Sequence, residues 1–203
     1  NVCAGRGKTN YAGGISVGAR KQCLIMNSFN LGSVTSSSTE TDACAGGIIA
    51  YNNNRANDWP GSLLVLENCW NAGAVASNWS TGGLISLPQW AELDMNRCYN
   101  LSSNLSGVYA GGLSGRLYKY HDTTSTAITY CYNVDTNYFG EEPYAEAIIS
   151  NTGLINADGT FPNSTPYPDL LTALNAWVDA NKSTYPELKN WVMGDNGYPT
   201  FAE

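Results

Sequence analysis

The sequence has little charge, a single histidine and no paired cysteine motif. Of its 203 residues 13% are charged, and 10 lysines and arginines stand against 17 aspartates and glutamates, which gives a net charge of −7. Nucleic-acid partners require a basic surface, so this balance excludes them. The six cysteines include no C-x-x-C pair, so a zinc site of the usual spacing is absent. We predict no metal and no cofactor.

The sequence also lacks a run of 18 or more apolar residues and a signal peptide at its start, so we expect no insertion into a membrane. Low charge together with 11% aromatic residues argues against disorder. The abundant residues are Gly, Asn, Ser, Thr and Tyr. Asn and Gly favour turns, and Tyr and Thr favour strands, which predicts an all-β protein rich in turns.

A motif of a small residue, an aromatic residue and Asn recurs along the chain, and an apolar residue stands three positions before each small one. The spacings between successive Asn residues are 41, 29 and 33. The copies are Ser28-Phe29-Asn30, Cys69-Trp70-Asn71, Cys98-Tyr99-Asn100 and Cys131-Tyr132-Asn133.

A second motif, two glycines followed by Ile or Leu, alternates with the first. Two motifs kept in order over about 150 residues predict a parallel β-solenoid of four to five irregular coils, in which equivalent residues stack. Asn1 is taken as the Asn that precedes the first Gly-Gly copy, and Ala145-Glu146-Ala147-Ile148 as a decayed last copy. The full copies are Gly13-Gly14-Ile15, Gly46-Gly47-Ile48, Gly82-Gly83-Leu84 and Gly111-Gly112-Leu113.

Equivalent residues of successive copies form columns along the stack, and each column has an expected role. The Asn residues form an amide ladder at a corner, where Asn tolerates left-handed backbone, and the aromatic residues stack ring on ring. Strict alternation leaves open which column faces inward. Cys69, Cys98 and Cys131 share the small-residue position with Ser28, so we expect buried free thiols. The alternatives are disulfides, chiefly for Cys3, Cys23 and Cys44, and a catalytic thiol.

The period changes after residue 150. Residues 151–167 form a connector rich in Gly and Pro, and apolar residues at helical spacing then predict a helix from Pro168-Asp169 to about Asn181. A strand at Trp191-Val192-Met193, a turn at Asp195-Asn196-Gly197 and a strand at the C-terminus follow. We expect residues 1–150 to form the solenoid and residues 151–203 a connector and a helix-plus-strand cap over the last open strand edge. A docking site for a partner is the alternative role of the cap.

The repeats also resemble a known family. Gly112-Leu113-Ser114-Gly115, with weaker copies at 47–50 and 83–86, resembles the GLUG motif of bacterial surface and secreted proteins, including adhesin-like proteins and certain immunoglobulin-cleaving peptidases. The tail, with its "LNAW" helix and final "W…GYP.F" strand, is similar to tails in surface proteins of gut-dwelling Gram-negative anaerobes. The resemblance implies a secreted or outer-membrane-associated location and further domains in a longer parent chain. A first coil that begins at Asn1 likewise leads us to expect a fragment.

Catalytic groups are sparse. His121 lies in a polar insertion and no G-x-S-x-G elbow is present. The carboxylate pairs are Glu92 with Asp94, Glu141 with Glu142, and Asp122 with Asp135, and none has a basic residue or calcium cluster beside it. We therefore predict no catalytic residue.

Aromatic residues in the insertions are more informative, because flat rings stack on the apolar faces of sugars. Packing over the side of the solenoid is the alternative role for them. The sequence thus favours a non-catalytic surface or secreted module that binds a glycan or host surface ligand. The competing functions are a stalk that presents another domain and, third, a carbohydrate-active enzyme. The candidate ligand-binding rings are Trp59, Trp79, Trp90, Tyr118 and Tyr120, with Tyr138 beside them.

Overall fold

The computed structural model describes residues 2–4, 9–19, 22–38, 42–53, 63–89, 92–117, 125–141, 143, 146–162 and 165–203. These residues form 23 strands and one helix. Five sheets are parallel throughout, and the sixth is the antiparallel hairpin of β22 and β23. The expectation of a mostly β fold with parallel strands is confirmed.

The five parallel sheets are named after the strands β4 to β8, one of which lies in each. The β4 sheet holds β4 (Cys23–Met26), β9 (Leu63–Glu67), β14 (Glu92–Asn96), β18 (Thr126–Thr129) and β20 (Ile148–Ser150). The β5 sheet holds β5 (Phe29–Asn30), β10 (Trp70–Asn71), β15 (Tyr99–Asn100), β19 (Tyr132–Asn133) and β21 (Gly153–Leu154).

The other three parallel sheets follow in chain order. The β6 sheet holds β1 (Val2–Ala4), β6 (Val34–Ser36), β11 (Val75–Ser77) and β16 (Leu105–Ser106). The β7 sheet holds β2 (Thr9–Gly13), β7 (Asp42–Gly46), β12 (Ser80–Gly82) and β17 (Tyr109–Gly111). The β8 sheet holds β3 (Ser16–Ala19), β8 (Ile49–Asn53) and β13 (Ile85–Gln89).

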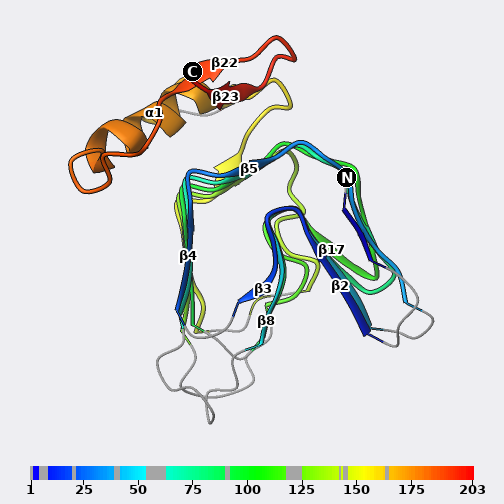
Figure 1. The fold of residues 1–203 in the computed structure, drawn as a ribbon. Helices are drawn as coiled ribbons and strands as arrows, with labels where there is room; N and C mark the ends of the chain where they lie inside the picture. The colour runs from blue at the N-terminus through cyan, green and yellow to red at the C-terminus, as the bar shows by residue number, and fades with distance from the viewer. Residues whose placement is uncertain are drawn as a thin grey trace.

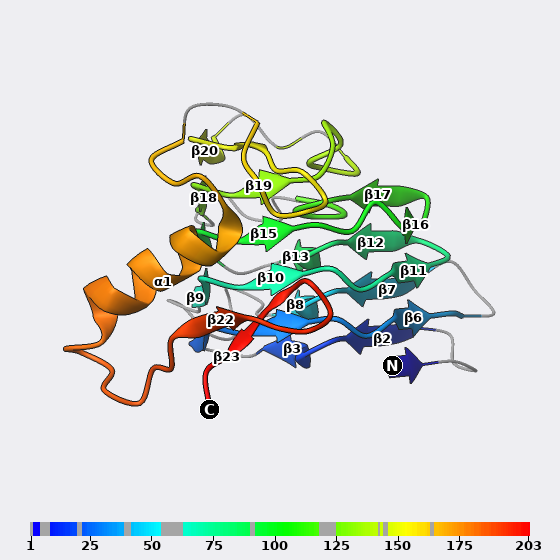
Figure 2. The same ribbon diagram turned by 90° about the horizontal axis from the view of Figure 1, so that it is seen from above.

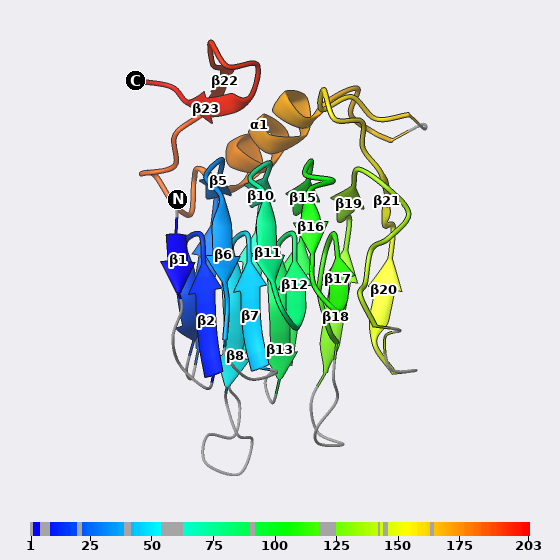
Figure 3. The ribbon, with the colours of Figure 1, turned by 90° about the vertical axis from the view of Figure 1, so that its right-hand side faces the viewer.

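The chain visits these sheets in one repeating order, so that each strand pairs with strands from the visit before and the visit after. One pass through this order is a circuit, and circuits 1 to 4 are those of Asn30, Asn71, Asn100 and Asn133. Circuits 1 and 2 place a strand in all five sheets, circuit 3 in four and circuit 4 in two. Strands β1–β3 precede circuit 1, and β20 and β21 follow circuit 4. Figure 1 shows the strands of each sheet one behind another, and Figure 3 shows the circuits side by side as a stack.

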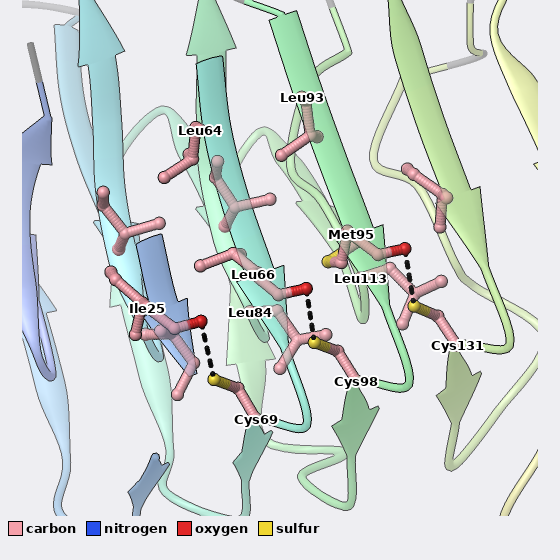
Figure 4. Close-up of a cluster of buried hydrophobic side chains, with 14 of the residues drawn as sticks. Ile25, Leu64, Leu66, Cys69, Leu84, Leu93, Met95, Cys98, Leu113 and Cys131 are labelled. Atoms are coloured by element: carbon pink, nitrogen blue, oxygen red, sulfur yellow. Dashed lines mark hydrogen bonds between the residues drawn. The ribbon is translucent and has the colours of Figure 1, made fainter. Parts of the chain in front are cut away.

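The small-residue column points into the stack and the aromatic column points out of it. Cys69, Cys98 and Cys131 lie in an interior core of aliphatic side chains between the β4 and β8 sheets. The Sγ atoms of the three cysteines lie 3.5 Å from the carbonyl oxygens of Ile25, Leu66 and Met95, each one circuit earlier (Figure 4). The expectation of buried thiols without a disulfide in this column is confirmed, and Cys23 also forms no disulfide.

The Asn column forms the expected amide ladder inside the stack. Each Nδ2 donates to the Oδ1 of the next circuit, at 2.8 Å from Asn30 to Asn71, 3.0 Å from Asn71 to Asn100 and 2.8 Å from Asn100 to Asn133. The second glycine of each Gly-Gly pair lies against a ladder Asn. A Cβ on Gly83 would come within 2.5 Å of the Asn100 amide, so the two motifs require each other.

The left-handed backbone position differs from the sequence prediction. It is occupied not by the ladder Asn but by the residue three positions before it. These corner residues have φ between 48° and 54°, and they are Asn27, Asn68, Arg97, Tyr130 and Asn151.

Of the two assignments at the ends of the repeat, that of Asn1 lies outside the described residues, and that of the decayed last copy is wrong. Ile148 lies in β20, beside Ala127 in the β4 sheet. Asn137 and Tyr138 instead accept the backbone bonds of Gly112 and Leu113, so this copy of the second motif has lost both glycines. The β5 sheet, without a further ladder Asn, continues through β21, slightly beyond residue 150.

The helix α1 spans Leu170–Asn181, as expected, with the Asp169 side chain accepting from the Thr172 amide at its N-terminus. Strands β22 (Trp191–Met193) and β23 (Pro199–Phe201) form the expected final hairpin. Together α1 and this hairpin are the C-terminal segment.

The C-terminal segment does not cover an end of the stack, contrary to the cap prediction. It lies along the outer face of the β5 sheet, crossing over β5, β10 and β15 (Figures 2 and 3). There it encloses an outer core with the aromatic column, in which Trp70, Leu174, Trp177 and Trp191 are at most 4% exposed. The physical reason is that the aromatic column is an apolar row along the side of the stack, which a single amphipathic helix can bury.

Candidate functional site

The described surface has a hollow beside the β4–β5 corner that is walled by aromatic rings. Its first part, with a volume of about 160 Å³, is lined by Arg97, Tyr130, Tyr132, Phe161 and Tyr167, among others. Its second part, of about 230 Å³, lies toward the end of the stack. The two parts share Tyr130, Tyr132, Thr165 and Pro166, and together they are termed the corner groove.

The corner groove occurs where the C-terminal segment leaves the corner uncovered. Along the first two circuits the corner residues are Asn27 and Asn68, and both bind that segment. The indole Nε1 of Trp191 donates to Asn27 Oδ1 at 2.7 Å, and Asn68 Nδ2 donates to the Leu174 carbonyl at 3.2 Å. The next two corner residues, Arg97 and Tyr130, line the groove instead.

Arg97 and Tyr130 are unusual residues for a left-handed backbone position. Their φ angles are 50° and 54°, in a region that disfavours side chains with a Cβ by about 1–2 kcal/mol. Asn reduces this cost by local hydrogen bonding, whereas Arg and Tyr do not. Strained residues of this kind concentrate at binding sites, and here both are found in the wall of one groove.

The rings of the corner groove are fixed by one another. Tyr132 stacks on Tyr99 with centroids 5.9 Å apart and planes inclined by 9°, and Phe161 meets the Tyr132 ring edge-on at 4.9 Å. The Arg97 guanidinium lies 5.1 Å from the centroid of Tyr130, which is 39% exposed. A rigid ring pair with an exposed third ring beside it is a platform for a flat ligand.

One cation, Arg97, and two carboxylates, those of Glu67 and Asp94, lie near the corner groove. Arg97 Nη1 donates to Asn96 Oδ1 at 2.6 Å. Burial raises the pKa of Glu67, the Asp94 carboxylate raises it further, and Arg97 opposes both. Burial also raises the pKa of the Tyr132 phenol, so this hydroxyl keeps its proton and remains a hydrogen-bond donor at neutral pH.

Of the five predicted ligand-binding rings, Trp79 alone lies among the described residues; Trp59, Trp90, Tyr118 and Tyr120 lie outside them. The Trp79 ring meets Tyr109 edge-on at 6.1 Å, and the Arg116 guanidinium lies 5.0 Å from Trp79 and 4.4 Å from Tyr109. Arg116 also forms an ion pair with Glu141. Trp79 therefore sits in a packed cluster apart from the corner groove.

Tyr138 and the predicted carboxylate pairs also lie apart from the corner groove. Tyr138 lies half-buried against the interior core. Of the carboxylate pairs, Glu92 and Asp94 share the outer side of β14, while Asp122, Glu142 and His121 lie outside the described residues. No carboxylate is among the residues that line the two parts of the corner groove.

The sequence analysis missed Arg97, Tyr130 and the connector residues Phe161, Thr165 and Pro166. The available signal was the position three before each ladder Asn, which is Asn in circuits 1 and 2 and changes to Arg97 and Tyr130 in circuits 3 and 4. The connector residues gave no signal, because their place depends on how the chain returns from β21 to α1.

Comparisons with known proteins give no relative for this chain: no family model, curated protein or solved structure matches it. Within the described ranges, α1 is the one helix, and it is neither long nor apolar enough to cross a bilayer. No group of three or more potential metal ligands gathers among those residues. The geometry of the corner groove is thus the basis for a functional proposal.

Proposed function

We propose that the chain is a parallel β-solenoid module that binds carbohydrate in the corner groove without catalysis, as part of a secreted or cell-surface protein. The repeating order of five parallel sheets supports the solenoid architecture. The resemblance of the Gly-Gly repeats to the GLUG motif supports the surface location. A glycan of a host or matrix surface is the partner class that follows.

One observation carries the binding function: rigid aromatic rings and polar side chains line the same open hollow. Tyr132 and Tyr130 supply flat faces, and Arg97, Asn151 and Thr165 supply polar groups at the walls. Sugars present an apolar C–H face and a rim of hydroxyls, which match this combination. A carboxylate pair, which glycoside hydrolysis requires, does not line this groove.

The test is a glycan array followed by calorimetry on each positive glycan. Tyr130→Ala removes an exposed ring of the groove and should weaken binding at least tenfold. Trp79→Ala removes a ring of the other aromatic cluster and should leave binding unchanged. Binding that depends on Trp79 and not on Tyr130 would show that the site lies at the Trp79 cluster and not in the corner groove. An array without any positive glycan would contradict the proposal.

The repeating stack itself favours a second function, that of a spacer. Each circuit stacks on the one before it and lengthens the stack by about 4.8 Å, the spacing between paired strands. A spacer needs rigidity and no ligand. Absence of glycan binding in a cooperatively folded chain would favour the spacer over the binding module.

A further inference from the structure

The aromatic column ends one circuit before the β5 sheet does. In register along that sheet stand Phe29, Trp70, Tyr99 and Tyr132, and the fifth position, beside Tyr132, is Gly153. The last strand of the sheet therefore carries no ring where each earlier strand carries one.

The earlier rings of the column are covered by other rings. Phe29 stacks on Trp70 at 5.2 Å, Trp70 stacks on Tyr198 of the C-terminal segment at 5.8 Å, and Tyr99 stacks on Tyr132. On the next strand of the sheet, Gly153 presents no side chain to Tyr132, and a Cβ there would come within 3.0 Å of the Tyr132 ring. Tyr132 is accordingly half-buried, whereas Tyr99 is 2% exposed.

The second part of the corner groove opens at this position. Its walls include Tyr132, Gly153 and Leu154 from the column, with Asn151 and Thr152 from the turn before it. Tyr130 and Pro166 close the sides. A volume of about 230 Å³ suits one six-membered ring and its substituents rather than an extended chain.

The walls distinguish a sugar ring from an aromatic one. Two tyrosine rings offer flat apolar contact, but the polar side chains of Asn151 and Thr152 also line the space. An aromatic ligand would offer these two side chains no hydrogen-bond partner, which costs free energy when they are buried. A pyranose satisfies them with its hydroxyls while its C–H face packs on the rings.

The local charge selects against an acidic sugar. Arg97 is the one cation among the residues that line the two parts of the groove, and it already contacts the Tyr130 ring and Asn96. Glu67 and Asp94 add negative charge close to it, and the whole chain carries −7. A carboxylated or sulfated ring would meet the negative charge that Glu67 and Asp94 leave in excess of this single guanidinium.

We propose that the second part of the corner groove holds one neutral pyranose ring, which takes the place of the aromatic ring that Gly153 lacks and packs against Tyr132 and Tyr130. The inference rests on the proposed carbohydrate-binding function and names the class of sugar and its seat. Gly153 is then a specificity residue, because its missing side chain creates the space.

The experiment uses ligand-observed NMR with methyl glycosides of glucose, galactose and mannose, and with the corresponding uronates. At least one neutral glycoside should bind at least fivefold more tightly than its uronate. Gly153→Phe supplies the missing ring and should reduce neutral glycoside binding at least tenfold. Its Cβ crowds the Tyr132 ring, so its Tm should be unchanged or lower and is measured alongside binding. Val108→Phe, which adds a ring on the exposed β16–β17 turn, is the matched control and should bind as the unaltered chain does.

A second variant tests the same seat if Gly153→Phe does not fold. Thr152→Val keeps the side-chain shape but removes a polar group from the wall, and it should weaken neutral glycoside binding several-fold. Full binding by Gly153→Phe, or by Thr152→Val where the first variant is unfolded, overturns this inference and leaves the proposed function intact. Tighter binding of the uronates, or of an aromatic amide in place of any glycoside, overturns the class of ligand. No binding of any glycan by the unaltered chain overturns the proposed function itself.

Discussion

The interior core and the outer core lie on opposite sides of the wall of the same stack, yet they are organised differently. The interior core consists of aliphatic side chains and thiols contributed one set per circuit, so each circuit buries its neighbours. The outer core is aromatic and is closed by one segment that is not part of the repeat. A repeat can thus complete its own interior, whereas the outward column needs a cover from elsewhere in the chain. The corner groove occurs where that cover ends.

The largest expected effect is the loss of Trp177, which is 4% exposed in the outer core. Trp177→Ala should reduce the free energy of unfolding of the C-terminal segment by about 3–5 kcal/mol. Hydrogen exchange should show faster exchange in α1 and β22 while the strands β9 and β14 keep their protection. Val192→Ala, which removes a 44% exposed side chain from the same segment, is the control. Equal loss of protection throughout the stack would show that the two cores are one cooperative unit.

The matching change in the interior core is Leu66→Ala. Leu66 is fully buried between circuits, and a cavity there should cost about 2–5 kcal/mol. Because the interior is shared between neighbouring circuits, exchange should accelerate in the strands of circuits 1 to 3 together. Leu66→Met conserves volume and should cost less than about 1.5 kcal/mol. A loss confined to β9 would contradict the shared interior.

The amide ladder should contribute less than either core. Asn100→Ala removes the acceptor of Asn71 Nδ2 and the donor to Asn133 Oδ1, both buried, and the orphaned groups should cost about 1–3 kcal/mol. Urea denaturation measures this change. Asn156→Ala, at an exposed Asn bonded to Thr160, should be close to neutral. If Asn100→Ala is as stable as the unaltered chain, the Asn column does not contribute to the free energy of unfolding and only maintains the spacing between circuits.

The smallest expected effect is a dependence of stability on alkaline pH, which comes from the thiols of the interior core. Burial raises the pKa of Cys69 and Cys98 well above the ordinary 9.0. The folded chain therefore keeps these protons where the unfolded chain loses them, so stability is full below pH 9 and falls as pH rises above it. The slope is about 1.4 kcal/mol per pH unit for each thiol. Cys98→Ser, which installs the residue found at Ser28, should reduce the slope; an unchanged slope would contradict the assignment.

Much of the repeat could be predicted from the sequence because its columns are stacked. The registers of Phe29 with Trp70 and of Tyr99 with Tyr132 follow directly from the spacing of the motifs. The direction of each column could not be predicted, because the left-handed residue before the small position interrupts strict alternation. The last copy of the second motif was misassigned because Asn137 and Tyr138 perform its backbone pairing without glycine.

The site was less predictable than the repeat. The periodicity of Leu170, Leu174 and Trp177 shows that α1 has a buried face, but not that its partner is the side of the stack rather than its end. The groove depends on where that helix stops and on the path of the connector through Phe161. Residues such as Arg97 become recognisable only once the corner they occupy is known.

The amide ladder also fixes the spacing between successive circuits along the axis of the stack. Its bonds stay between 2.8 and 3.0 Å although the Asn residues are 41, 29 and 33 positions apart. Residues gained or lost between one Gly-Gly pair and the next strand therefore leave the height of the stack unchanged. The length of the stack along its axis therefore depends on the number of circuits. The segments between circuits can differ in length and sequence without changing the distance between the two ends of the stack.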